Sequence, residues 1–307
     1  MKNLIYLLLA LPLLFTSCSN EDMATSEESV QVSFRAELPQ AMGTRAVALE
    51  DLTVYCAVFE NDVEIAGLRT MIDVVAGQPI VFAPRLVKGR TYDIAFWASK
   101  EGAYNVTDMT AICRTSPVPE GITEADYDAF TANATITVEG NHSQDITLCR
   151  PLALLNLGVT EEDWNGVANP DTFDLPPKNI TLTISGVRTS FNALTGNALN
   201  SAVSDITYYL GVTGNDLEVN GKTYINIAQC YVLMDATKQN DSTTANLTYS
   251  IYSNSSPIRE NAQIIHVPLQ ANHITNVVGG LLTGVVSYTI TVKDDGAYAE
   301  EDNNKDI

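Results

Sequence analysis

The sequence predicts an all-β protein built from antiparallel β-sandwiches, and three features of the chain support this fold class. Short segments in which apolar and polar residues alternate recur along the chain, and this period of two is typical of strands with one buried face. Turn residues such as Gly and Pro separate these segments at frequent intervals. No long amphipathic helical pattern lies between them. Because the chain has 307 residues, two sandwiches in tandem fit its length best.

The clearest strand is predicted over 30–38, where apolar and polar residues alternate without interruption. Pro39 ends it, because proline cannot donate to a ladder. The segment that follows, 40–46, is predicted to be an exposed loop with one basic residue, Arg45, before Ala46. The side chains expected on the buried face of the strand are Val30, Val32, Phe34, Ala36 and Leu38.

Further strands are predicted in both halves of the chain. One helical turn interrupts them near 123–130, with Thr123 as its cap and Asp126 three residues later. The segments with strand-like composition or alternation are 52–59, 79–84, 92–98, 134–138, 145–149, 152–157, 180–185, 224–234, 247–252, 263–269 and 286–292.

A domain boundary is predicted at Pro151. Proline is excluded from the interior of a central strand, so one strand should end before it and another should begin after it. We therefore expect an N-terminal sandwich over 30–150 and a C-terminal sandwich over 151–293. The last residues, 294–307, form an acidic tail without a strand pattern.

Residues 1–17 are predicted to be a lipoprotein signal peptide. Lys2 gives a positive start, and the apolar run 4–15 is too short to span a bilayer as a stable helix. Small residues then lead into Cys18. This pattern resembles that of bacterial lipoproteins, in which the cysteine is acylated and becomes the first residue of the mature chain. An ordinary secretory signal with a coincidental cysteine is the alternative.

Residues 18–29 are predicted to be a flexible tether, because the segment is acidic and rich in Ser and Thr. Glu21 and Asp22 resemble the signal that sends lipoproteins of the Bacteroidetes to the cell surface. A lipid on Cys18 would hold the rest of the chain at the outer membrane.

The net charge of the chain argues against one class of partner. At pH 7 the formal charge is −20, which repels phosphate backbones and anionic lipid head groups. Nucleic acid is therefore not an expected partner. A solvated acidic surface is the favoured explanation of the charge.

The sequence contains no pattern typical of an enzyme or a metal site. The histidines, His142, His266 and His273, lack carboxylate or cysteine neighbours at ligand or triad spacing. The chain has no Gly-x-Ser-x-Gly elbow, phosphate-binding glycine loop or HExxH motif. We expect neither catalytic residues nor a cofactor or metal.

The four cysteines after Cys18 also match no metal motif. They are Cys56, Cys113, Cys149 and Cys230. An exported protein can form disulfides, and three pairings are open. At each position a buried free thiol is an equal alternative.

The two tryptophans have different contexts. Trp97 lies in an apolar strand and is expected in the core. Trp164 follows three acidic residues near a loop. It is either an exposed platform on which a sugar stacks or part of a short helix that packs on the sandwich.

Five phrases of the sequence, taken in order, resemble the fimbrillin-like lipoproteins of the Bacteroidetes. The resemblance extends over about 30–292 and is closest to uncharacterised outer-membrane members related to minor fimbrial subunits. The phrases are 91–98, 128–130, 150–158, 190–196 and 267–283.

The resemblance implies two transthyretin-like β-sandwich domains and a processing step. In polymerising members an arginine-specific protease cuts in the loop after the first strand, and here that cut would fall between Arg45 and Ala46. Releasing the strand 30–38 would open a groove that a strand from another subunit could refill. We expect such detachment only if the strand does not lie at the centre of its sheet and the loop is accessible to the protease.

The C-terminus departs from the polymerising pattern. A donor needs an alternating segment beyond the last strand of its own fold, and 294–307 has none. If 286–292 closes the second sandwich, the chain can accept a strand but cannot give one; alternatively, 286–292 is itself the donor.

The sequence thus favours a non-enzymatic surface lipoprotein that works with other fimbrial subunits. As a tip, cap or anchor subunit it would act in fimbrium assembly or adhesion, with a host or bacterial surface molecule as a further ligand. The alternative is a glycan-binding outer-membrane lipoprotein that uses Trp164.

Overall fold

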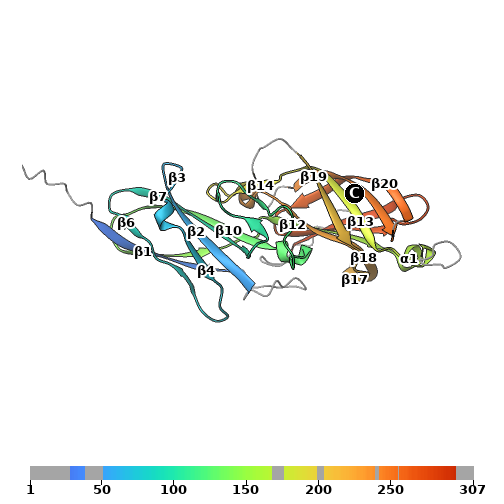
Figure 1. Cartoon of the computed structure of the whole chain (residues 1–307), viewed down its shortest axis with the longest axis horizontal. Helices are drawn as coiled ribbons and strands as arrows, with labels where there is room; N and C mark the ends of the chain where they lie inside the picture. Colours follow the sequence, from blue (N-terminus) through green and yellow to red (C-terminus); the bar gives the residue numbers. More distant parts are fainter. Residues whose placement is uncertain are drawn as a thin grey trace, which may run out of the picture.

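The computed structural model describes residues 28–38, 51–167, 176–198, 204–238, 242–254 and 256–294. Strands make up most of this part of the chain, which confirms the all-β prediction. Figure 1 shows two β-sandwiches placed end to end, the N-terminal one in blue and green and the C-terminal one in yellow and red. The helical elements are short: η2 (Ala66–Leu68), η3 (Glu124–Tyr127), α1 (Glu161–Val167) and η4 (Ala236–Lys238).

The N-terminal sandwich packs two sheets around one apolar core. In the first sheet, the strand order is β11-β1-β5, and β6 also pairs with β1; in the second, it is β10-β7-β2-β3, and β4 also pairs with β2. Phe34, Phe82 and Phe96 meet between the sheets with ring centroids 6.1–6.2 Å apart. The strands are β1 (Ser29–Glu37), β2 (Leu52–Glu60), β3 (Val63–Glu64), β4 (Thr70–Asp73), β5 (Ile80–Phe82), β6 (Arg85–Val87), β7 (Thr91–Lys100), β10 (Ala129–Thr137) and β11 (His142–Thr147).

The C-terminal sandwich has larger sheets. Their strand orders are β17-β18-β12-β21-β22 and β16-β13-β19-β20. All eight residues of β12 are buried, because this strand lies in the middle of its sheet and is covered on both faces. The strands are β12 (Leu152–Val159), β13 (Asn179–Val187), β16 (Ser204–Gly211), β17 (Asp216–Val219), β18 (Lys222–Leu233), β19 (Ser242–Ser253), β20 (Ser256–Gln270), β21 (His273–Gly280) and β22 (Ser287–Asp294).

A small fifth sheet joins the two halves of the chain. Its order is β15-β14-β9-β8, so strands from before and after Pro151 share one ladder. Ser190 and Phe191 pair with Cys113 and Ile112 across the join. The strands are β8 (Tyr104–Asn105), β9 (Ile112–Arg114), β14 (Ser190–Asn192) and β15 (Asn197–Ala198).

Two strand pairs correct the expectation of purely antiparallel sheets. β1 runs parallel to β11, and β12 runs parallel to β21. In each sandwich, the first strand therefore pairs with a strand from the end of the same half. Such pairing joins residues more than 100 positions apart, as Val32 and His142 show, and residue alternation does not specify it.

Candidate functional site

Three of the predicted site residues lie outside the described part of the chain. They are Cys18, at which lipidation is predicted, and Arg45 and Ala46, at which processing is predicted. The predicted signal peptide, nearly all of the tether and all of the tail beyond Asp294 also lie outside it. Lipidation and cleavage therefore stay predictions.

The strand predicted to be released lies at the centre of its sheet. β1 pairs with β11 on one side and with β5 and β6 on the other. Detachment was expected only for a strand away from the centre, so this position argues against simple release of β1. Release of the strand stays a prediction. Because ladder hydrogen bonds hold β1 on both sides, cutting the following loop would not by itself free it.

Alternate residues of β1 face the core as predicted, although not to the same extent. Val32, Phe34 and Ala36 are buried, whereas Val30 and Leu38 are half-buried. At roughly 1.5–3 kcal/mol for each large apolar side chain, loss of β1 would remove several kcal/mol of burial. It would also leave two unpaired strand edges, on β11 and on β5 with β6, facing one strand-wide gap.

The last described strand closes the second sandwich. β22 pairs antiparallel with β21 over eight residues, from Ser287 opposite Gly280 to Asp294 opposite His273. It is the outer strand of its sheet, and Ile290 is its buried apolar anchor. In this structure β22 is thus a strand of the C-terminal sandwich of the same chain.

The two sandwiches meet in a third apolar core. Trp97 of β7 is fully buried there, with its ring centroid 5.1 Å from that of Tyr104 and 5.4 Å from that of Phe191. Leu154 of β12 and Tyr231 of β18 belong to the same cluster. Trp97 is therefore a core residue, as its sequence context predicts, but the core lies between the domains.

A largely buried ion pair of the N-terminal half lies at this junction. The Arg114 guanidinium donates to both carboxylate oxygens of Glu124, at 2.8 and 2.6 Å, and lies 3.4 Å from the centre of the Tyr127 ring. Oε1 of Glu124 also accepts a hydrogen bond from the backbone N–H of Tyr231 at 3.2 Å. Burial lowers the pKa of Arg114, but the hydrogen bonds to Glu124 more than offset this and raise the pKa, so the guanidinium stays charged.

A second buried ion pair lies at the predicted domain boundary. Nε and Nη2 of Arg150 donate to the Asp128 carboxylate at 2.7 and 2.9 Å. Nη1 of Arg150 donates to Oδ1 of Asn272 at 3.2 Å. One arginine thus ties the end of the first sandwich to the β20–β21 turn of the second.

A cleft of about 710 Å³ opens beside the first ion pair. One wall is the segment from Arg114 to Tyr127, which includes η3, and the other is β16 with the chain up to Thr213 and part of β18. β16 is the outer strand of its sheet. The sequence analysis missed this strand, although Ile206, Tyr208 and Leu210 alternate with polar or exposed residues in it.

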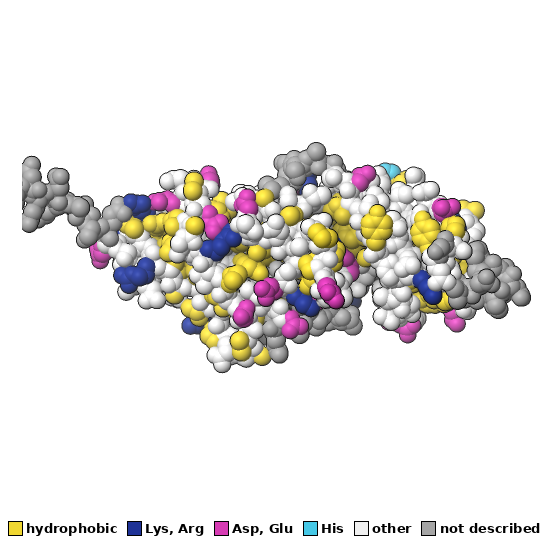
Figure 2. All heavy atoms as spheres, in the orientation of Figure 1, with side chains coloured by type: hydrophobic (Ala, Val, Ile, Leu, Met, Phe, Trp, Pro, Cys, Tyr) yellow, Lys and Arg dark blue, Asp and Glu magenta, His cyan; other side chains and the backbone are white. Residues whose placement is uncertain are grey.

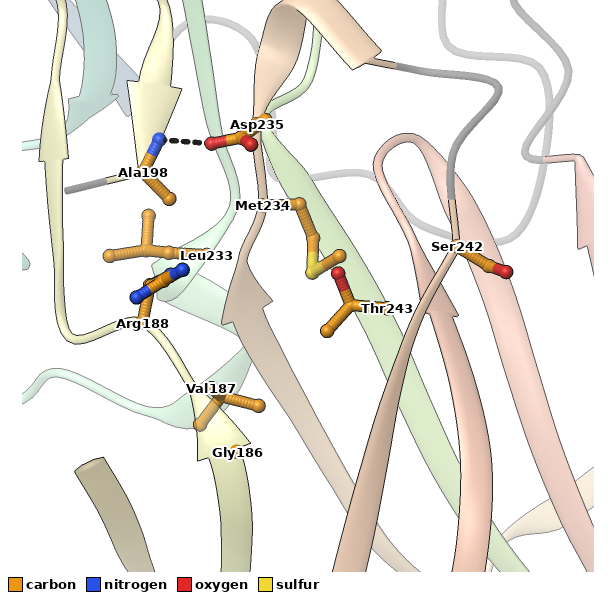
Figure 3. A pocket seen from close by; sticks show the side chains of 9 residues that line it. All are labelled: Gly186, Val187, Arg188, Ala198, Leu233, Met234, Asp235, Ser242 and Thr243. Carbon is orange, nitrogen blue, oxygen red and sulfur yellow. Dashed lines mark hydrogen bonds between the residues drawn. The ribbon is translucent and has the colours of Figure 1, made fainter. Parts of the chain in front are cut away.

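A second cavity of about 300 Å³ is lined by residues from β13, β15, β18 and β19 (Figure 3). Oδ1 of Asp235 accepts a hydrogen bond from the backbone N–H of Ala198 at 2.6 Å on its wall. Ala198 and Ser242 both line the cavity and directly adjoin residues outside the described part. We assign no ligand to it.

Trp164 packs on the C-terminal sandwich through helix α1. Its side chain is half-buried against the core, and Gly214 lies beside its ring. The helix is held by Asp163, whose carboxylate accepts hydrogen bonds from the backbone N–H groups of Leu281, Leu282 and Thr283 at 2.7–2.9 Å. The packing alternative thus accounts for Trp164, and a sugar-stacking role stays a prediction.

Within the described residues, no disulfide joins Cys56, Cys113, Cys149 and Cys230. Burial raises the pKa of the Cys56 thiol to about 12 and that of Cys230 well above its usual value. These two thiols are therefore protonated and unreactive at neutral pH.

Charged side chains form no metal-binding cluster in the described part of the chain. Within it, no three His, Cys, Asp or Glu side chains gather as they would around a metal ion. On the face in Figure 2, acidic and basic side chains are scattered over both domains. Of the helices that the structure describes, none has the length and apolar character needed to cross a bilayer.

Comparison with protein families gives a match over most of the chain. The model of a family of unknown function (DUF6562) matches residues 24–307. No curated protein matches the sequence.

Solved structures of similar proteins come from Bacteroides and Porphyromonas. A candidate polysaccharide-binding protein from Bacteroides thetaiotaomicron has a TM-score of 0.49 and 11% identity, with 86% of this chain and 95% of that chain covered. A candidate adhesin from Bacteroides ovatus has a TM-score of 0.48 and 9% identity, with 82% and 88% covered. A tip fimbrial protein from Porphyromonas gingivalis, solved with a C-terminal truncation, has a TM-score of 0.45 and 10% identity, with 87% and 100% covered.

Proposed function

Because the chain belongs to the DUF6562 family, whose function is unknown, we propose a function from its own residues and fold. It acts as a non-enzymatic, surface-exposed lipoprotein, an accessory subunit in fimbrium assembly or adhesion. The observation that carries this proposal is the place of β1: a short strand with three alternating buried side chains, held between β11 and the β5–β6 pair.

The proposed partner interaction is an exchange of strands. A gap flanked on both sides offers two rows of backbone donors and acceptors to an incoming strand, and its core-facing pockets accept alternate apolar side chains. The exposed edge of a sheet would offer only one such row of backbone donors and acceptors. Because β1 cannot leave without exposing Phe82 and Phe96, around which Phe34 packs, cleavage after Arg45 would act by allowing replacement and not by simple release.

The proposed role in this exchange is that of an acceptor. β22 pairs along its whole length with β21 of the same sandwich, so donating it would uncover the edge of β21. The lipid on Cys18 would hold the unprocessed protein at the outer membrane. Other fimbrial subunits are the proposed partners.

Replacement of Arg45 tests this function directly. In cells that express Arg45→Ala, we expect the protein to remain at the outer membrane and to be absent from sheared, purified fimbriae. Arg35→Ala is the matched control, because this arginine lies exposed on β1, and it should leave incorporation unchanged. Equal incorporation of both variants would contradict the exchange.

Glycan binding is the second candidate function. It is favoured by the cleft between η3 and β16, whose lining is rich in hydroxyl and aromatic groups. It is compatible with an accessory subunit, because adhesion requires a ligand site separate from the assembly site.

A further inference from the structure

We infer that the cleft between η3 and β16, called here the junction cleft, binds a neutral oligosaccharide. This inference rests on the proposed role in adhesion and names the ligand class and the site. The volume of about 710 Å³ lies within the range of about 300–1,000 Å³ typical of small-ligand sites. Its walls come from both domains, so the buried core between them fixes its shape.

The floor of the junction cleft is already organised. Arg114 is held by two hydrogen bonds from its guanidinium to Glu124 and lies against the rings of Tyr127 and Tyr208, at 3.4 and 4.9 Å from their centres. The Tyr208 hydroxyl donates to the backbone carbonyl oxygen of Tyr231 at 2.9 Å. A ligand would therefore meet a floor whose side chains need little reordering, which lowers the entropic cost of binding.

The rim of the junction cleft combines an exposed aromatic ring with hydroxyl and amide groups. Tyr209 is 82% exposed and Val118 is 60% exposed, although both are large apolar side chains. A tyrosine ring in this position offers an apolar face for the C–H side of a sugar ring. Thr115, Ser116 and Gln229 supply hydroxyl and amide groups of the lining that can serve sugar hydroxyls. The lining hydroxyls that already hydrogen-bond within the protein are those of Thr123, Thr207 and Thr213.

The charges of the junction cleft select an uncharged ligand. The ionised side chains in its lining are Arg114 and Glu124, and these neutralise each other in a bidentate pair. The protein as a whole carries a net charge of −20, which repels acidic sugars. The accessible lining is more apolar than polar, which suits the C–H faces of uncharged sugar rings. A strand-like peptide that pairs with the outer edge of β16 is an outcome that the test separates from sugar binding.

Binding to defined glycans tests this inference. The mature lipoprotein in detergent is applied to an array of neutral hexasaccharides of glucose, mannose, galactose, xylose and N-acetylglucosamine, with polygalacturonate as the acidic comparison. We expect saturable binding to at least one neutral hexasaccharide. Tyr209→Ala should weaken that binding about tenfold or more, while its thermal unfolding temperature stays unchanged because the ring is exposed.

Two further variants test whether the sugar binds in the junction cleft or elsewhere on the protein. Tyr288→Ala removes a partly exposed tyrosine of β22 that does not line the junction cleft, and this variant should bind like the unmodified protein. Trp164→Ala should also retain binding. If Trp164→Ala loses binding while Tyr209→Ala retains it, the sugar site lies on α1 and the inference is overturned.

Several results would overturn the inference. They are the absence of binding to every neutral hexasaccharide, binding to polygalacturonate alone, equal weakening in the two tyrosine variants, and binding only of a peptide with the sequence of residues 28–38. None of these results depends on fimbrium assembly, so a failure here is distinct from a failure of the Arg45 experiment.

Discussion

Trp97 of the N-terminal sandwich and Phe191 of the C-terminal half lie against each other, with ring centroids 5.4 Å apart and both side chains fully buried. Around them, β9 and β14 pair across the junction. Two ion pairs of the N-terminal half each make one hydrogen bond to the C-terminal half, from the Tyr231 backbone N–H to Glu124 and from Arg150 to Asn272. Domains joined by a small polar interface usually move independently. Here the shared core packs the two sandwiches against each other, so we expect them to unfold together.

Removal of the Phe191 ring should weaken both sandwiches together. Phe191→Ala leaves a cavity in the shared core, at a cost of about 3–5 kcal/mol in the free energy of unfolding. Hydrogen exchange should speed up in β7 as well as in β14. The matched control is Phe82→Ala, a buried phenylalanine of the N-terminal core alone, which should affect the N-terminal sandwich first. Unchanged exchange in β7 of Phe191→Ala would show that the domains are uncoupled.

The junction ion pair should show strong coupling between its partners. Arg114→Met alone leaves the Glu124 carboxylate buried without its counter-charge and should cost about 3–5 kcal/mol in denaturant unfolding. The double variant with Glu124→Gln should recover part of this loss. Lys88→Met, which breaks an exposed pair with Glu28, should cost less than about 1 kcal/mol. If the two substitutions change the free energy of unfolding additively, the predicted coupling between Arg114 and Glu124 is contradicted.

Asp163 should hold helix α1 to the loop that follows β21. Its carboxylate accepts three backbone N–H groups and the Thr283 hydroxyl. In Asp163→Asn, one acceptor oxygen becomes a donor, so we expect a loss of about 1.5–3 kcal/mol and faster hydrogen exchange at 281–283. Glu162→Gln, on the exposed side of the same helix, should leave this exchange unchanged. Protection retained in Asp163→Asn would contradict the assignment.

Asp126 should make stability depend on pH in the acid range. Burial raises its pKa, but hydrogen bonds from Lys100 and Thr123 outweigh this, and the net pKa is lowered from 3.8. A lowered folded-state pKa stabilises the fold above the unfolded-state value, and this stabilisation is lost as the pH falls through the folded-state value. Urea unfolding of the protein and of Asp126→Asn should therefore differ by a constant amount above about pH 5 and converge below about pH 4. Parallel curves down to pH 2 would contradict this role.

Local patterns predicted individual elements of this fold well. Alternation over 30–38 identified β1 and its buried face, and Asp126 accepts hydrogen bonds from the backbone N–H and hydroxyl of Thr123 as the helical-turn pattern predicts. These features depend on residues close together in the chain. The apolar context of Trp97 likewise predicted its burial.

Non-local pairing could not be predicted in the same way. Nothing in the alternation of β1 specifies its parallel partner β11, so its central position was missed. The continuous apolar run in β2, buried on both faces, was the available signal for the junction core, because a strand with one solvated face alternates. The junction cleft combines β16 with a segment about 90 residues earlier, and no spacing rule connects them.

The most direct test of the strand-exchange account is mass spectrometry of the N-terminus in two fractions of the same cells, the outer membrane and the purified fimbriae. The account predicts an acylated Cys18 in the membrane fraction and Ala46 as the first residue of the protein in fimbriae. A chain still continuous from an acylated Cys18 through Arg45 in the fimbrial fraction would contradict it.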